Sequence, residues 1–272
     1  MLDLTTYASP PTPRQLIMKL LSAAANNELD AAGAIRACAL FDISANNTRV
    51  ALARLQANGL IETVNRGAYT LGHAGLALGR NISAWRDAEE HLREWDGSWA
   101  AVMTANLGRR DRKALRTRER ALALLGFREL EASLFIRPDN LAGGVSRIRE
   151  RLFSLGLESE ALVFRMTSLA DDREAASRIL WQEETLEEHY RQQQQVLAES
   201  MARLSSLTIE EAAKETYLLG DLAVRRLVFD PLLPEPLVDT RCRSHFRDTV
   251  RQYDEAGQLA WQRFLSPPPP AG

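Results

Sequence analysis

Residues 44–59, SANNTRVALARLQANG, have the pattern of a short helix with a signal at each end. Ser44 is a good N-cap, and Asn58-Gly59 is a typical C-terminal stop. One face of this helix carries side chains at the spacing of a buried stripe: Thr48, Ala51, Leu52 and Leu55. The stretch therefore predicts a helix over about residues 45–57 with one face in the core.

Two helices precede this stretch and a hairpin follows it. Thr12 followed by Pro13 starts the first helix, and a second helix is expected over about residues 31–40. Residues 60–64 and 68–71 flank Asn65-Arg66-Gly67, which has the composition of a tight turn between strands. Three helices followed by a short hairpin predict a winged helix-turn-helix over residues 10–75.

A second alternation of strands and helices follows a helical connector over residues 76–95. Strands are expected at 99–104, 134–136 and 161–166, with helices at 109–125 and 145–155. A further strand around residues 127–130 stays open. This order suits a ferredoxin-like α+β unit over residues 96–170.

From residue 171 to residue 265 the chain has helical periodicity. One long helix is expected between Ile179 and Leu204, and a last helix between Arg243 and Phe264. The Pro-rich tail, residues 266–272, is expected to be disordered. The fold class is therefore predicted as α+β, with an N-terminal winged helix-turn-helix, a ferredoxin-like middle domain and a C-terminal helical domain over residues 171–265.

The composition is that of an ordinary globular protein. The 272 residues are 45% hydrophobic and 26% charged, without a run of apolar residues long enough for a membrane span. The N-terminus lacks the basic segment and apolar stretch of a secretory signal. Cys38 and Cys242 lie far apart without a CxxC pattern, which argues against a disulfide framework and a zinc site. We expect a cytoplasmic protein with no cofactor and no metal.

The net charge of −2 conceals a difference between the two ends of the chain. Residues 1–80 contain seven Lys and Arg against five Asp and Glu, whereas residues 173–272 contain twelve against sixteen. The total charge therefore says nothing about nucleic acid, and a locally basic surface remains open.

The predicted third helix is the first candidate for a functional surface, because in a helix-turn-helix this helix enters the major groove. Asn can pair with adenine and Arg with guanine on the base edges, and we expect Asn46 and Arg49 in these roles. Arg66 at the hairpin tip is placed to reach a phosphate or the minor groove. Polar residues that only face water, and an Arg54 that pairs with an acid, are the alternatives. The residues expected to contact DNA are Ser44, Asn46, Asn47, Arg49, Arg54 and Arg66.

Residues 109–120, RRDRKALRTRER, hold seven basic residues in twelve. On a helix, Arg109, Arg112, Arg116 and Arg120 line one side. Such a row can hold the phosphates of DNA or of a nucleotide-containing ligand. The alternative is a solvated helix face.

Catalytic motifs are not found in the sequence. His73, His91, His189 and His245 are scattered without the spacing of a zinc site or a triad. There is no GxxxxGK[ST] or GxGxxG, and the strand at 99–104 has no carboxylate at its end. We therefore expect no enzyme. A metal-dependent nuclease or other enzyme built on the middle domain, and an adaptor that uses the winged helix for protein contacts, are the alternatives.

Several short motifs resemble those of the PaaX family of transcriptional repressors. The first is Thr48-Arg49-Val50-Ala51-Leu52-Ala53-Arg54-Leu55, followed by Gly59-Leu60 and Tyr69-Thr70-Leu71. Further along the chain come Trp95-Asp96-Gly97-Ser98-Trp99, Leu125-Gly126-Phe127, Ser133-Leu134-Phe135-Ile136-Arg137-Pro138 and Asp230-Pro231-Leu232-Leu233-Pro234. The resemblance spans about residues 11–264, with the motifs in order.

The resemblance implies a repressor of a catabolic operon, typically for phenylacetic acid degradation. It implies a homodimer on palindromic double-stranded operator DNA, and a middle domain folded like the CRISPR-adaptation nuclease. It also implies release by a small-molecule effector, an aryl-acyl-CoA such as phenylacetyl-CoA. The run Gln192–Gln195 departs from the family pattern, so another acyl-CoA or acid stays open as the effector.

Coenzyme A carries phosphate charges that need basic partners. We therefore hypothesise that Arg109, Arg112 and Arg116 help to bind such an effector. The competing hypothesis is that these residues contact phosphates of flanking DNA.

Overall fold

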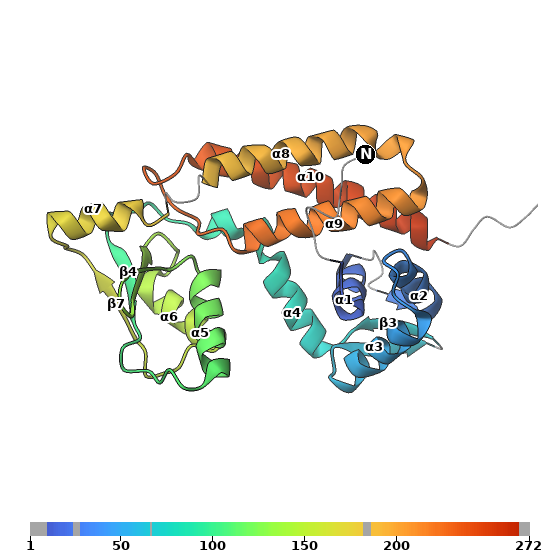
Figure 1. Cartoon of the computed structure of the whole chain (residues 1–272), viewed down its shortest axis with the longest axis horizontal. Helices are drawn as coiled ribbons and strands as arrows, with labels where there is room; N and C mark the ends of the chain where they lie inside the picture. The colour runs from blue at the N-terminus through green and yellow to red at the C-terminus, as the bar shows by residue number, and fades with distance from the viewer. Residues whose placement is uncertain (1–9, 24–27, 66, 182–185, 267–272) are drawn as a thin grey trace, which may run out of the picture. The chain divides into compact units, whose positions relative to one another are not determined.

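The structure, a computed structural model, describes residues 10–23, 28–65, 67–181 and 186–266 (Figure 1). The chain forms two compact units. Unit 1 comprises residues 1–84, 195–224 and 249–272, and unit 2 comprises residues 85–194 and 225–248. Three helices contribute residues to both units: α8 (Leu186–Arg203), α9 (Ile209–Val228) and α10 (Thr240–Leu265).

Unit 1 begins with the three helices and the hairpin that the sequence predicts. The helices are α1 (Pro13–Ala23), α2 (Ala31–Ala39) and α3 (Ala45–Ala57), and the hairpin strands are β2 (Ile61–Asn65) and β3 (Ala68–Leu71). The structure adds a short strand, β1 (Glu28–Asp30), so that the antiparallel sheet has the order β1-β3-β2. Helix α4 (His73–Ser83) follows the hairpin.

Side-chain caps explain where α1 and α2 begin. The Thr12 backbone N–H donates to Gln15 Oε1 at 2.9 Å, and the Gln15 N–H donates to Thr12 Oγ1 at 3.3 Å. This reciprocal pair is a capping box. The Asp30 carboxylate accepts a hydrogen bond from the Gly33 N–H, so the residue that ends β1 also caps α2.

The core of unit 1 joins the N-terminal helices to parts of α9 and α10. Leu16, Ile17 and Leu21 of α1 are fully buried in it, together with Leu52 and Leu55 of α3. The ring of Tyr217 on α9 contacts Phe41 edge-on at 5.2 Å and Trp261 of α10 at 6.3 Å between centroids. The helical face predicted for α3 is therefore buried, and residues from near the C-terminus complete the core around it.

Unit 2 contains a four-stranded antiparallel sheet with the order β5-β6-β4-β7. Its elements along the chain are β4 (Trp99–Met103), α5 (Arg112–Leu124), β5 (Arg128–Glu131), β6 (Leu134–Pro138), α6 (Gly144–Ser154) and β7 (Leu162–Met166). Strand β5 is the one that the sequence left open. Helices α5 and α6 cover one face of the sheet (Figure 1), where Leu122 and Leu152 pack against Ala100 and Val102.

Some boundaries differ from the prediction. The helix expected from Arg109 begins at Arg112, because the Asp111 carboxylate caps it by accepting from the N–H groups of Lys113 and Ala114 at 2.8 and 3.2 Å. The single long helix expected from Ile179 is wrong at its start, since α7 (Asp171–Ile179) ends there in a turn and α8 begins at Leu186. The connector is α-helical only to Ser83 and continues as short 3-10 turns over Ala84–Arg86 and Ala88–His91.

Two further expectations concern the chain as a whole. The tail expected to be disordered lies outside the described residues from residue 267 onward. Among the helices that the structure describes, none combines the length and the apolar character needed to cross a membrane.

Candidate nucleic-acid interface

Helix α3 buries one face and exposes the other. Thr48, Leu52 and Leu55 are buried, and the Thr48 hydroxyl donates to the Ser44 carbonyl at 3.1 Å. The opposite face is open to solvent and includes a 42% exposed valine, Val50. The polar residues on that face are Asn46, Asn47, Arg49, Arg54 and Gln56. The structure thus brings together the side chains that the sequence assigns to DNA contact on this helix.

Ser44 caps α3, as predicted. Its Oγ accepts a hydrogen bond from the Asn47 N–H at 3.3 Å. The hydroxyl hydrogen is not used in this contact, so Ser44 can still donate to a phosphate oxygen in front of the helix. The side chain of Asn47 is exposed one turn further along.

Within the described residues, no acid pairs with the arginines of α3. Neither Arg49 nor Arg54 forms an ion pair with any residue that the structure describes. The alternative in which Arg54 pairs with an acid therefore finds no partner in the described part of the chain. Two cations on an exposed helix face without acids suit an anionic partner.

A groove runs between α3 and the first turn of α1. Its volume is about 410 Å³, and its lining includes Thr12, Arg14, Asn47, Val50 and Arg54. Arg14 is exposed, and it was not among the predicted site residues. The signal for it was present, since Thr12 caps the helix and so places Arg14 in its first turn. The groove adds a third arginine to the surface around α3.

The hairpin is tied to α3 by side chains. Gln56 Nε2 donates to Thr63 Oγ1 on β2 at 3.1 Å. Gly67 has a φ of +81°, a left-handed conformation that suits glycine in the turn. Arg66, the residue expected to project from the tip, lies outside the described residues.

Helix α5 carries a second basic surface. Arg110, Arg112, Lys113, Arg116 and Arg120 are exposed. Arg109 precedes the helix and donates from Nη2 to Ser133 Oγ at 2.7 Å. Of the three candidate effector-binding residues, Arg112 and Arg116 lie one turn apart on α5. Arg109 instead contacts Ser133, in the turn between β5 and β6.

The Trp-Asp-Gly-Ser-Trp motif forms a tight structural turn before β4. Trp95 Nε1 donates to the Ser98 carbonyl at 2.5 Å, and Ser98 donates to the Asp96 carboxylate from its N–H and its hydroxyl. These bonds from Ser98 hold the pKa of Asp96 well below its usual value. The Trp99 ring stacks on Trp181 at 6.0 Å. The motif is used for packing rather than for a free binding surface.

Arg137 links three of the family-like motifs in the interior of unit 2. This side chain is 1% exposed and donates to the carbonyls of Leu125, Pro138 and Pro231 and to Asn140 Oδ1. Burial lowers the pKa of Arg137 to about 10. Sequence reasoning did not find this role, because the acceptors are backbone carbonyls up to 94 residues away.

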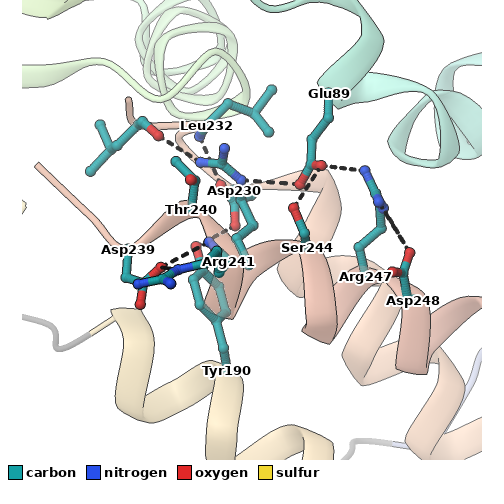
Figure 2. A network of polar contacts seen from close by, with 12 residues as sticks. Glu89, Tyr190, Asp230, Leu232, Asp239, Thr240, Arg241, Ser244, Arg247 and Asp248 are labelled. Carbon is teal, nitrogen blue, oxygen red and sulfur yellow. Dashed lines mark hydrogen bonds and ion pairs between the residues drawn. The ribbon is translucent and has the colours of Figure 1, made fainter. Parts of the chain in front are cut away.

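The Asp-Pro-Leu-Leu-Pro motif is held by a second set of bonds (Figure 2). The Asp230 carboxylate accepts from the Tyr190 hydroxyl at 2.5 Å and from the Leu232 N–H at 2.7 Å. Burial raises the pKa of Asp230 and, together with the nearby Asp230 carboxylate, that of Tyr190. Asn140 Nδ2 donates to the Leu232 carbonyl at 2.8 Å. The motif is thus a buried, hydrogen-bonded loop.

Glu89 is the centre of an adjoining polar network (Figure 2). Its carboxylate accepts from Arg243 Nε at 3.2 Å, from Ser244 Oγ at 3.0 Å and from Arg247 Nη1. Arg243 is almost fully buried and also donates to the Leu233 carbonyl at 2.7 Å. This network joins the 3-10 turn at 88–91 to the first turns of α10, and its acid and basic groups already satisfy one another.

No group of three or more His, Cys, Asp or Glu side chains is arranged to hold a metal ion in the described ranges. Exposed basic side chains are grouped on α3 and on α5 among the described residues.

Comparisons with known proteins bear on these units. The model for the PaaX protein central Cas2-like domain matches residues 92–177, and the model for the PaaX-like protein C-terminal domain matches residues 181–263. Uncharacterized protein Rv0674 from Mycobacterium tuberculosis has a similar fold, with a TM-score of 0.60, 19% identity, and coverage of 93% of this chain and 98% of that one. A search of curated proteins finds no match.

Proposed function

Because the chain belongs to the PaaX-like protein family, we propose that it is a DNA-binding transcriptional regulator, and more narrowly a repressor of a catabolic operon. The two matching models cover the middle and C-terminal segments and do not reach residues 1–91. The proposal for DNA binding therefore rests on the N-terminal residues themselves.

The observation that carries this proposal is the exposed face of α3. Three helices, of which the third is capped by Ser44, are followed by a hairpin in an antiparallel sheet. This is the element order of a winged helix-turn-helix. Arg49 and Arg54, which pair with no acid among the described residues, lie with the amides of Asn46 and Asn47 on the face of α3 that the core leaves open. These are the side chains that read base edges and hold phosphates in the major groove.

Each residue has a distinct proposed role. Asn46 and Arg49 contact bases, because they are exposed and lie away from the Ala51/Leu55 core face of α3. Ser44, Asn47 and Arg54 position the helix on the phosphate backbone, with Arg14 across the groove as an additional contact. Arg66 contacts a phosphate from the hairpin.

The regulator is proposed to act as a homodimer that an effector releases from DNA. Two α3 helices of a dimer would read half-sites about one helical turn, ~34 Å, apart or a multiple of that distance. An effector such as an aryl-acyl-CoA that binds the operator-free state more tightly shifts the population away from DNA. The family resemblance supports this part of the proposal. The ferredoxin-like interpretation of the middle segment has support from the strand order β5-β6-β4-β7.

An electrophoretic shift with the intergenic DNA upstream of the protein's own gene tests this function. We expect a discrete complex, and we expect Arg49→Ala to weaken specific binding by about 1–3 kcal/mol, which is roughly 5-fold to 150-fold. Arg241→Ala is a matched control, since Arg241 is 86% exposed and paired with Asp239 in unit 2. A footprint and an affinity that Arg49→Ala leaves unchanged would reject base contact by Arg49.

A further inference from the structure

Several basic side chains are exposed on α5, and one basic side chain of the helix, Arg118, is buried. Arg118 is 4% exposed and donates to both Glu158 oxygens, at 2.6 and 3.2 Å, and to the Gly108 carbonyl at 3.0 Å. Among the residues that the structure describes, the exposed cations have no such partners. None of the following forms an ion pair within the described ranges: Arg110, Arg112, Lys113, Arg116 and Arg120.

The spacing of these cations is regular. Arg112, Arg116 and Arg120 follow one another at four-residue intervals, so they lie on one stripe of the helix. At a rise of 1.5 Å per residue, neighbouring members are about 6 Å apart along the axis, and the row extends over about 12 Å. A row of this kind presents separate charges to an extended anion, rather than several charges to one point.

The acids nearby do not cancel this charge. Residues 109–120 contain seven basic residues and two acids, Asp111 and Glu119, whereas the whole chain has a net charge of −2. Asp111 is engaged at the N-terminus of α5 as its cap. The positive charge is thus a local property of this surface, which attracts polyanions at long range.

The apolar residues of α5 point away from this surface. Ala121 and Leu122 are buried in the core of unit 2 against the sheet. A small ligand such as an acyl-CoA is usually enclosed in a concave and mostly apolar site. The stripe of Arg112, Arg116 and Arg120 is instead on the outside of a helix, where the backbone of a duplex, with one charge per ~1.7 Å of axis, can lie along it.

We propose that the exposed face of α5 is a second DNA-binding surface, which holds backbone phosphates without reading bases. This proposal rests on the proposed function, which supplies DNA as the ligand, but it does not depend on the contacts of α3. Arginine–phosphate hydrogen bonds of this kind are charge-assisted and independent of sequence. The surface therefore strengthens binding to every duplex by a similar factor.

The test compares two triple variants with equal loss of charge. The first is Arg112→Gln, Arg116→Gln and Arg120→Gln. The control is Arg147→Gln, Arg191→Gln and Arg241→Gln, three exposed arginines that are paired with Glu150, Glu187 and Asp239. Affinities for an operator duplex and for an unrelated duplex of equal length are measured over a salt series, after circular dichroism has shown that both variants are folded.

The expected result is a loss of affinity by the same factor on both duplexes for the α5 variant. Its plot of log K against log salt should also be less steep, by about 0.9 per lost contact and so by up to about 2.7. The control should keep the wild-type slope. Calorimetry with phenylacetyl-CoA should give the same affinity for the α5 variant as for the wild type.

Each of the following results overturns the proposal. A wild-type slope in the α5 variant shows that the face contacts no phosphates of DNA. A wild-type slope together with lost phenylacetyl-CoA binding assigns the face to the effector instead. A wild-type chain that binds neither duplex refutes the proposed function and this proposal together, so the two failures are distinguishable.

Discussion

Replacement of Arg137 by Ala should destabilise unit 2 strongly. The change removes the donors to the carbonyls of Leu125 and Pro231 and to Asn140 Oδ1 in a region that excludes water. A buried acceptor without a donor costs about 1–3 kcal/mol. Against this, the charge itself is expensive to bury, since a fall in the Arg137 pKa from 12.5 to about 10 corresponds to roughly 3 kcal/mol.

The net effect of these opposing contributions is a loss of about 3–5 kcal/mol in the free energy of unfolding, as is usual when one partner of a buried charged network is removed. Arg137→Met separates the causes, because it fills most of the volume while leaving the same acceptors unpaired. We expect Arg137→Met to lose nearly as much stability as Arg137→Ala.

Urea unfolding followed by tryptophan fluorescence measures this loss. Trp181 is a suitable reporter, since its Nε1 donates to the Gly126 carbonyl at 3.3 Å, next to an acceptor of Arg137. Arg241→Ala, at an 86% exposed side chain, should change stability by no more than about 0.5 kcal/mol. If Arg137→Ala costs less than about 1 kcal/mol, the idea that this guanidinium holds the loop at 230–234 is wrong.

Three further predictions concern single residues. Arg66→Ala should weaken binding to all duplexes alike and lower the salt slope by about one unit, and a loss confined to one base position would contradict the phosphate role. The Arg118 hydrogen bonds lower the pKa of Glu158, so the wild type should lose stability as pH falls below 4.5. Urea titrations at pH 7 and pH 4 should show that Glu158→Gln loses less stability between these two pH values than the wild type does. Gly126→Ala should lower the thermal midpoint, because its φ is +72° and a Cβ would lie 2.6 Å from Pro231 Cα; an unchanged midpoint would contradict that close contact.

The N-terminal elements were predictable because local signals agree with the tertiary structure. The capping residues Thr12 and Ser44 set the starts of α1 and α3, and the spacing of Leu52 and Leu55 determines which face of α3 is buried. The remaining face must then be exposed, which is why the exposure of Asn46 and Arg49 could be predicted from the sequence. Strand β1 was missed because three residues are too short for a periodic signal.

The basic stretch at 109–120 shows where sequence reasoning stops. Its helical spacing indicates a row of arginines, but the same spacing does not distinguish Arg118 from Arg116. Only the position of Glu158, 40 residues later, makes Arg118 a buried structural residue and leaves the others exposed. A charge becomes available to a ligand only where the fold supplies no partner for it.

The sequence by itself determined the order of the elements, the buried face of α3 and the concentration of basic residues before and along α5, because each depends on neighbours within a few turns. Only the tertiary structure shows that the family-like motifs contact one another, because Arg137 and Asn140 donate hydrogen bonds to the loop at 230–234. The physical reason is that those hydrogen bonds join backbone and side-chain groups more than 90 residues apart. The partners in these hydrogen bonds depend on how the helices and strands pack, and a local sequence pattern carries no information about that packing.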